Sequence, residues 1–284
     1  MRNRFVLPGA VFFLLASWTT SPAQVILLGV SGNGSSSPGD LFTVNETTGE
    51  VILVNDVINS AGFSGVAINS GRQMYASSIA GLGTTSELYK LNPETGAIIS
   101  NIGPISAPGG PISIGDLDFQ PLTDVLYGIR SNADRASKGG EIYTIDLLTA
   151  AATLVGASDP VGSSGGLAFS PDGTLWRTGN TDPPAEINML LQIDPNDAST
   201  IDTTMTGMNF YYDGLAVRPS DGVIFATGGA VIHGVHRIDP VAKTETPLTP
   251  GPAHSLSDLA FDPGFVPTRL ITWGRLKHAY ETRE

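Results

Sequence analysis

Three aspartates recur at similar places in a repeated sequence pattern and could together hold a divalent cation. Asp116 lies in GDLDFQ, Asp213 in DGLAVR and Asp258 in SDLAFD, and the other two copies of the pattern carry Ser64 and Gly165. If the copies surround one axis, the three carboxylates point toward each other. Carboxylates that close raise one another's pKa or require a cation, and calcium prefers carboxylate and carbonyl oxygens. The pattern therefore predicts a metal site at Asp116, Asp213 and Asp258, with calcium as the candidate ion.

The same aspartates have a structural alternative, in which no cofactor is bound. Aspartate side chains commonly accept hydrogen bonds from the backbone amides of turns and loops. Each carboxylate would then join loops of neighbouring repeats. Residue types alone do not separate this interpretation from a metal site.

Aromatic and imidazole side chains precede two of these aspartates. Tyr211 and Tyr212 come directly before Asp213, and His254 lies four residues before Asp258. Exposed rings at the mouth of a channel would suit a sugar or a peptide, so these three residues are the predicted ligand-binding residues. The alternatives are packing between repeats for the tyrosines and a solvated loop position for His254.

The sequence motifs of a phosphate-binding loop and of a zinc protease are absent from the chain. There is no GxxxxGK[ST] or HExxH segment, and the chain has no cysteine. His233 and His236 are three residues apart in a segment that reads as a strand, where alternation sends them to opposite faces. We therefore assign no catalytic residue from the sequence.

The elements that must position these residues are short strands in a fivefold repeat. Each copy starts with an apolar stretch, continues through a turn such as SPDGT or PSDG into a second one, and adds a third such as LYKLN or LLQID and then a fourth. The first stretches are SGVAIN (64–69), GDLDFQ (115–120), GGLAFS (165–170), DGLAVR (213–218) and SDLAFD (257–262). Segments of this length, rich in β-branched and aromatic residues and bounded by Gly, Pro, Asn or Asp, are typical of strands. Four strands every 45 to 54 residues, roughly, predict a β-propeller.

The two ends of the chain predict how the ring closes. VILLGV (25–30) matches a second strand without a first, and SDLAFD near the C-terminus is a first strand without a second. Their pairing would complete one blade and remove an open sheet edge. This gives an all-β propeller of five four-stranded blades. If LITWG (270–274) is instead a second strand, six blades are the alternative.

The N-terminal segment predicts secretion. MRNR is followed by the apolar run FVLPGAVFFLLASW and the small residues of SPAQ, as in a cleaved signal peptide. The predicted organisation is a signal peptide at 1–23, a propeller at 24–272 and a basic tail at 273–284 outside it. No later segment reads as a membrane span, and a net charge of −12 disfavours nucleic acid as a partner.

The units LYKLNPETGAI and GGLAFSPDGTLW resemble the repeats of secreted bacterial β-propellers in the broad YVTN, NHL and WD-repeat-like grouping. The resemblance covers residues 25–272, and its motifs specify blade geometry. Long loops such as GPISAPGGPIS and TGNTDPPAEIN lie at one end of the predicted ring, where binding residues usually gather. We therefore interpret the chain as a noncatalytic extracellular protein that binds an unidentified ligand or protein through this long-loop face.

An enzyme is the alternative function. Lactonase-type propellers hold a divalent ion in the central channel, and the three aspartates would supply carboxylates for one. Such propellers place a glutamate on an early inner strand, however, and GVAI (65–68) offers none. The resemblance thus leaves a metal-dependent hydrolase as the second interpretation.

Overall fold

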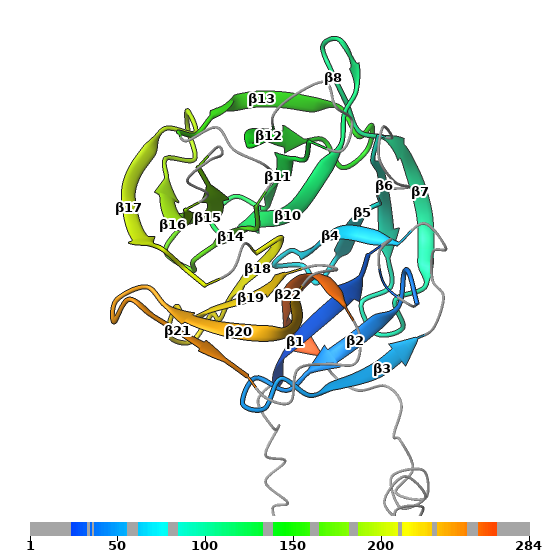
Figure 1. Ribbon diagram of the computed structural model, residues 1–284. Helices are drawn as coiled ribbons and strands as arrows, with labels where there is room; N and C mark the ends of the chain where they lie inside the picture. Colours follow the sequence, from blue (N-terminus) through cyan, green and yellow to red (C-terminus); the bar gives the residue numbers. More distant parts are fainter. Residues whose placement is uncertain are drawn as a thin grey trace, which may run out of the picture.

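Five four-stranded antiparallel sheets surround one axis in a computed structural model of the chain (Figure 1). The structure describes residues 24–32, 35, 37–55, 62–78, 85–132, 139–159, 165–181, 187–209, 212–228, 232–248 and 255–265. Within these ranges the regular elements are all strands, and no helix long and apolar enough to cross a membrane occurs there. The protein is therefore an all-β propeller with five blades, as the repeat predicts.

The blades are numbered here in chain order, beginning with the one that contains the N-terminal strand. Blade I consists of β22 (Leu256–Phe265), β1 (Gln24–Ser31), β2 (Leu41–Val44) and β3 (Val51–Asn55). Blade II consists of β4 (Phe63–Ile68), β5 (Met74–Ser78), β6 (Glu87–Leu91) and β7 (Ile98–Pro104). Blade III consists of β10 (Ile114–Gln120), β11 (Val125–Arg130), β12 (Glu141–Ile145) and β13 (Ala152–Ala157).

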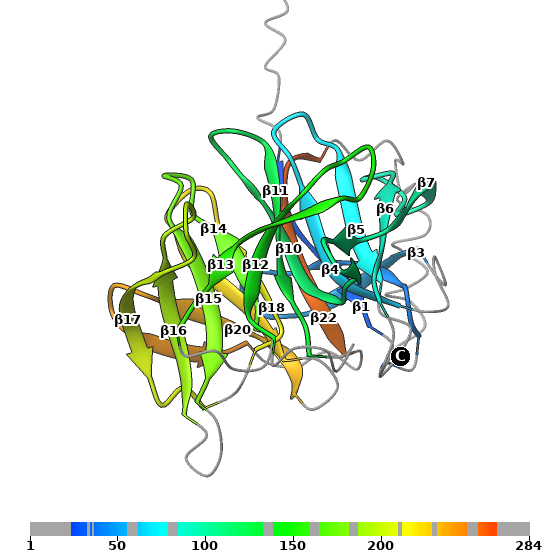
Figure 2. The ribbon, with the colours of Figure 1, turned by 90° about the horizontal axis from the view of Figure 1, so that it is seen from above.

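The last two blades follow the same order from the axis outward. Blade IV consists of β14 (Leu167–Phe169), β15 (Leu175–Asn180), β16 (Asn188–Ile193) and β17 (Thr200–Thr206). Blade V consists of β18 (Gly214–Val217), β19 (Ile224–Gly228), β20 (Ile232–Asp239) and β21 (Thr244–Pro247). A small hairpin of β8 (Ser106–Ala107) and β9 (Gly110–Pro111) lies in the link between blades II and III. Seen from above, the inner strands β10, β18 and β22 lie between β17 and β7 (Figure 2).

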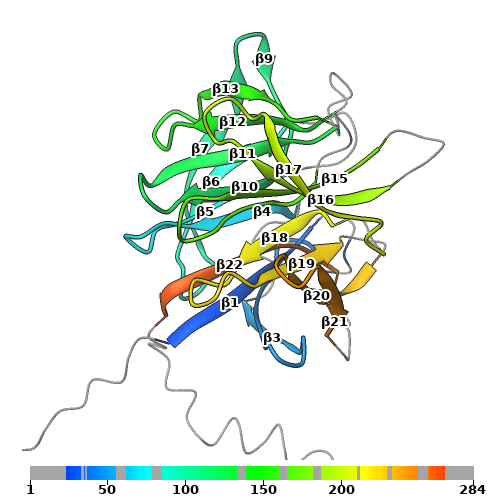
Figure 3. The ribbon, with the colours of Figure 1, turned by 90° about the vertical axis from the view of Figure 1, so that its left-hand side faces the viewer.

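The ring closes through the pairing that the two chain ends predict. β22 and β1 are antiparallel neighbours, with Leu28 opposite Ala260 and Val30 opposite Asp258. The orange C-terminal strand therefore lies beside the blue N-terminal strand (Figure 3). This confirms five blades and excludes the use of VILLGV in a sixth. The LITWG segment, the predicted signal peptide and the predicted tail lie outside the described residues.

The core is divided among the interfaces between blades. Alternation along each inner strand gives two sets of side chains, and members of both belong to the buried clusters between blades. Leu117, Leu167, Leu215 and Leu259 belong to the first set and are buried at successive interfaces. The second set alternates with them along the strands and consists of small or acidic residues next to the central axis.

Candidate functional site

The register of the sheets aligns the five inner strands residue by residue. Leu117 pairs with Gly128, Leu215 with Ala226 and Leu259 with Gly29, so these leucines occupy one equivalent position. The residue before each leucine starts a layer of side chains around the axis. That layer contains Gly65, Asp116, Gly166, Gly214 and Asp258. Two residues farther along lies the next layer, with Ala67, Asp118, Ala168, Ala216 and Ala260.

Asp116 joins three blades through its carboxylate. Its Oδ1 accepts a hydrogen bond from its neighbour Leu117 N–H at 2.6 Å. Its Oδ2 accepts from Leu167 N–H in blade IV at 2.6 Å and from Leu215 N–H in blade V at 3.3 Å. Inner strands are sheet edges with unpaired N–H groups, and an inward-pointing acid satisfies them.

Asp258 performs the same role for the other two blades. Its Oδ1 accepts from Leu259 N–H at 2.7 Å, and its Oδ2 accepts from Val66 N–H in blade II at 2.6 Å. Asp116 and Asp258 also share a hydrogen bond. The two aspartates, called the axial pair below, thus connect the inner strands of all five blades.

The glycines of this layer leave space for the axial pair. A methyl group at Gly214 would lie 2.5 Å from Asp258 Cα and 2.7 Å from Asp258 Oδ1. At Gly65 it would lie 2.9 Å from Leu117 N. The channel is therefore full at this layer, with two carboxyl side chains and three glycines.

Burial raises the pKa of both members of the axial pair well above the usual range of an aspartate. Both side chains are fully buried, so removal from water disfavours their charged forms, and the amide hydrogen bonds oppose this only in part. A shared hydrogen bond between two carboxyl groups requires a proton on one of them. The pair therefore keeps a proton when isolated carboxylates would have lost theirs.

The third predicted metal ligand lies elsewhere. Asp213 precedes Gly214, so it is one residue out of register with the axial pair, and a shift of one residue sends a side chain to the other face of a strand. Its N–H donates to Thr227 O at 2.9 Å, and burial raises the pKa of its carboxyl to about 6. The predicted equivalence of Asp116, Asp213 and Asp258 is thus wrong for Asp213.

The geometry gives the predicted calcium ion no ligand set. Within the described ranges, no group of three or more His, Cys, Asp or Glu side chains could hold a metal ion. All four carboxyl oxygens of the axial pair accept hydrogen bonds from backbone N–H groups. This is the arrangement expected if the aspartates connect neighbouring repeats and bind no metal. These residues therefore do not fit a metal centre, and calcium binding by this chain stays a prediction.

Tyr212, one of the predicted ligand-binding residues, is part of the core. It is fully buried, packs with the His236 ring at a centroid distance of 5.2 Å and donates its hydroxyl proton to Glu245 Oε1. Because no part of the ring reaches solvent, Tyr212 cannot present a surface to a ligand; packing between repeats was the correct alternative. Tyr211 and His254 lie outside the described residues.

A pocket of about 240 Å³ opens on the axis next to the layer of Asp118. All five blades contribute to it, through the ends of their inner strands and the turns that follow. These turns are the short ones, so the pocket lies at the end of the channel opposite to the predicted long-loop face. Many residues of the long loops lie outside the described ranges.

Asp118 is the ionisable group nearest the axis in this pocket, which is called the Asp118 pocket below. Its Oδ1 accepts from Phe119 N–H at 2.8 Å, and its Oδ2 accepts from Phe169 N–H in blade IV at 2.6 Å. The side chain is only partly buried and lines the pocket. Removal from water raises the pKa of Asp118 to about 7, and the two amide bonds lower it less.

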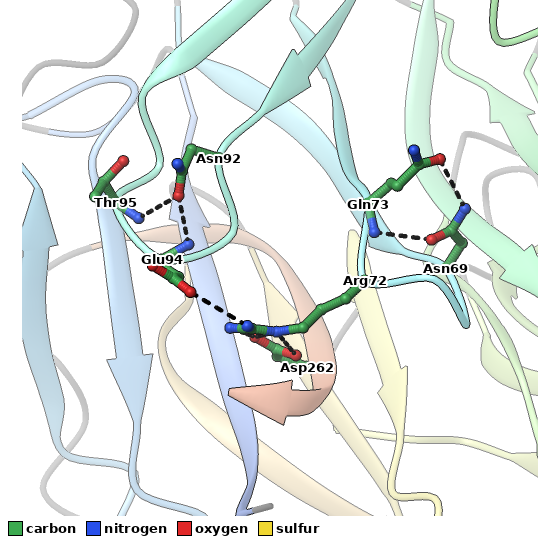
Figure 4. Close-up of polar contacts among 7 residues, drawn as sticks. All are labelled: Asn69, Arg72, Gln73, Asn92, Glu94, Thr95 and Asp262. Atoms are coloured by element: carbon green, nitrogen blue, oxygen red, sulfur yellow. Dashed lines mark hydrogen bonds and ion pairs between the residues drawn. The ribbon is translucent and has the colours of Figure 1, made fainter. Parts of the chain in front are cut away.

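Further polar groups come from the turns of blades II and III. Ser70 N–H donates to Asp124 Oδ1 at 3.0 Å, and the Ser70 hydroxyl donates to Asp124 Oδ2, so one turn is tied to the other. Asn69 Oδ1 accepts from Gln73 N–H at 2.8 Å, which orients the Asn69 amide (Figure 4). Asn69, Ser70, Asp118 and Asp124 are the polar side chains among the described lining residues.

The same end of the ring is locked by an ion pair between blades I and II. Arg72 lies in the turn between β4 and β5. It donates two N–H groups to Asp262 of β22, at 3.0 and 2.9 Å, and forms an ion pair with Glu94 as well (Figure 4). The Asp262 side chain is fully buried, whereas Arg72 is partly exposed. This contact fixes the C-terminal strand against blade II beside the pocket.

The sequence interpretation missed Asp118, although a signal for it was present. Four of the five inner strands carry alanine at this position, and GDLDFQ alone carries an acid. An acid where the other four copies have alanine departs from the repeated architecture, and because it also lines a pocket it is a candidate for function.

Known structures of low sequence identity share the fold. No protein-family model matches the sequence, and no curated protein matches it. A candidate gluconolactonase is 18% identical with a TM-score of 0.51, over 84% of this chain and 82% of that one. A gluconolactonase from Xanthomonas campestris is 15% identical with a TM-score of 0.48, over 81% and 80%. A candidate 6-phosphogluconolactonase from Bacteroides uniformis is 13% identical with a TM-score of 0.46, over 85% and 100%.

These comparisons contradict the interpretation of the chain as a noncatalytic binding or scaffold protein. That interpretation relied on the absence of a catalytic motif from repeats that specify blade geometry. One structure that shares the fold of this chain is named as a candidate gluconolactonase, so missing motifs are no argument against catalysis here. At this identity the likeness establishes the propeller fold, and the chemistry must be argued from the site.

Proposed function

We propose that this protein is a hydrolase of cyclic carboxylic esters, that is a lactonase-type enzyme, and that it acts in the Asp118 pocket. The observation that carries the proposal is Asp118 itself. It is a carboxyl group on the wall of an axial pocket, with a pKa raised to about 7. A general base or acid is most effective when its pKa is close to the working pH. The names of the structural neighbours add support for this reaction class.

Asp118 would transfer the protons of the hydrolysis. Its carboxylate accepts a proton from a water molecule while the water oxygen forms a bond to the carbonyl carbon of the ester. The bond from that carbon to the ring oxygen then breaks, and the proton on Asp118 passes to the leaving oxygen. Water is consumed, a hydroxy acid is formed and Asp118 returns to its starting state.

Asn69 is the candidate donor to the oxygen that becomes negative during the attack. One N–H of its amide points to Gln73 Oε1 at 3.3 Å, and the group has a second N–H. Its orientation is fixed by the bond from Gln73 N–H, and a donor held in place before the reaction stabilises an oxyanion best. Asn69 lines the same pocket as Asp118.

The test is lactone hydrolysis by the wild type and by Asp118→Asn, followed as acid release at constant pH. We expect Asp118→Asn to lower kcat/KM by at least about 100-fold, since general base catalysis contributes about 10²–10⁴-fold. In the wild type, kcat/KM rises with pH through a midpoint close to 7, because only the deprotonated carboxylate accepts the proton.

Two further variants separate catalysis from folding. Asp116→Asn changes a carboxyl group of the same inner strand, one layer away. That group also accepts hydrogen bonds from backbone N–H groups, but it does not line the pocket. Asp202→Asn changes an exposed strand residue. Both keep their activity per folded molecule. Activity of Asp118→Asn equal to that of Asp116→Asn, or no hydrolysis of any lactone by the wild type, rejects the proposal.

The remaining predictions from sequence keep the status of proposals. Secretion through residues 1–23 and membership of the YVTN, NHL and WD-repeat-like grouping are part of the proposed picture, in which the enzyme works outside the cytoplasm. Comparison of the N-terminus of the exported protein with Gln24 tests the first of these directly.

A further inference from the structure

The Asp118 pocket has a regular fivefold plan that is broken on one side. Four blades place a proline three residues after their position in the layer of Asp118, namely Pro121, Pro171, Pro219 and Pro263, and all four line the pocket. Blade II has Ser70 instead. In the layer of Asp118, the other four blades have alanine. Departures from the repeat therefore introduce polar groups, and they do so only in blades II and III.

The result is a pocket with two unlike walls. Blades II and III supply all four polar side chains of the described lining, Asn69, Ser70, Asp118 and Asp124. The wall opposite comes from blades IV, V and I and is apolar, with Phe169, Val217, Ala260 and Phe261 among its residues. A ligand that fits must have a polar side and a hydrocarbon side.

The charges of the pocket exclude an anionic ligand. No lysine, arginine or histidine is found among the described residues that line it, whereas Asp118 and Asp124 are acids. The whole chain has a net charge of −12. A phosphate or carboxylate on the substrate would lose water here without gaining a cationic partner, and a buried charge needs one.

We infer that the substrates are small, uncharged lactones with a hydrocarbon substituent, and that sugar lactones and phosphorylated sugar lactones are disfavoured. The ester group lies against Asn69 and Asp118, and the hydrocarbon lies against the wall of Phe169 and Phe261. A volume of about 240 Å³ lies below the roughly 300–1,000 Å³ of sites for drug-sized ligands, so the pocket suits one ring with a short chain. The hydroxyl groups of a sugar would meet this wall without hydrogen-bond partners. This inference rests on the proposed function.

The experiment compares three substrates on one preparation: δ-nonalactone, δ-valerolactone, which lacks the butyl chain, and D-glucono-1,5-lactone. We expect kcat/KM for δ-nonalactone to exceed that for each of the others by at least about tenfold, because contact of hydrocarbon with the apolar wall is favourable. Ratios between substrates do not depend on the fraction of folded enzyme. In Ala216→Ser, which adds a hydroxyl to the apolar wall, the preference for δ-nonalactone over D-glucono-1,5-lactone falls.

The outcomes separate this inference from the proposed function. Hydrolysis of D-glucono-1,5-lactone that depends on Asp118 and equals or exceeds that of δ-nonalactone overturns the inference and leaves the function standing. If no lactone is hydrolysed, the function fails, and calorimetry decides the ligand chemistry alone. Binding of δ-nonalactone that is tighter than binding of the polar ring 1,5-anhydroglucitol supports the inference, and absence of δ-nonalactone binding overturns it.

Discussion

Two neighbouring layers of the central channel use the same residue type in opposite ways. In the first layer, Asp116 and Asp258 are fully buried, bond to each other and connect all five blades. In the next, Asp118 makes the same two kinds of amide bond but also lines an open pocket. Burial raises the pKa in both layers.

The difference teaches which property identifies a functional acid in this fold. A raised pKa is common to both layers, so by itself it does not distinguish a functional site from a structural contact. Contact with an open pocket does distinguish them. The axial pair is enclosed by side chains and glycines, whereas Asp118 is only partly buried and lines an open pocket.

The largest expected effect is a loss of folding stability when a member of the axial pair is removed. Asp116→Ala leaves the N–H groups of Leu117, Leu167 and Leu215 without their acceptor in a buried channel. We expect the free energy of unfolding to fall by about 3–5 kcal/mol, since each buried unsatisfied group costs about 1–3 kcal/mol. Urea denaturation measures this. Asp118→Ala, with two amide partners and an open pocket, loses less; equal losses in the two variants contradict the distinction between the layers.

A smaller loss of stability is expected at the end of the channel, where Arg72 forms an ion pair with the buried Asp262. Asp262 is fully buried, and its partner Arg72 is partly exposed. Arg72→Met keeps much of the side-chain volume but leaves the carboxylate without a cation, which should lower the free energy of unfolding by about 2–4 kcal/mol. The double variant Arg72→Met with Asp262→Asn recovers part of the loss, because the buried charge is then removed too. No recovery indicates that Arg72 contributes through packing alone.

An effect that appears only as a dependence of stability on pH is expected from the proton of Asp118. Its pKa of about 7 in the folded protein lies above the ordinary value of 3.8. The folded state therefore binds this proton more tightly than the unfolded chain, and the resulting stabilisation is present below pH 4 and lost as pH rises through 7.

Thermal unfolding of the wild type and of Asp118→Asn checks this prediction. Since asparagine does not titrate, the Tm of the wild type relative to the variant should decrease between pH 4 and pH 8. A pKa raised from 3.8 to about 7 corresponds to at most about 4 kcal/mol, since each pKa unit is worth about 1.4 kcal/mol. Asp202→Asn, at an exposed strand position, is the matched control for the substitution itself. A constant difference between wild type and Asp118→Asn indicates that Asp118 has an ordinary pKa in the folded state.

The sequence alone determined the architecture, because blade geometry is repeated five times and each copy reports on the others. Strand alternation, tight turns such as SPDGT and the unpaired end strands VILLGV and SDLAFD suffice to predict five closed blades. The sequence also contained both readings of Asp116 and Asp258, as metal ligands or as acceptors of backbone amides. What it could not do was choose between them, since hydrogen-bond partners come from residues 51 to 192 positions away.

The tertiary structure decided the choice of site through register and access. A shift of one residue separates Asp213 from the axial pair, and this became visible only when Gly214 was seen opposite Thr227. Tyr212 became a core residue because neighbouring blades close over it. The Asp118 pocket exists only where five separate inner strands converge, so no single segment encodes it; the sequence marks it solely by an aspartate where four other copies have alanine.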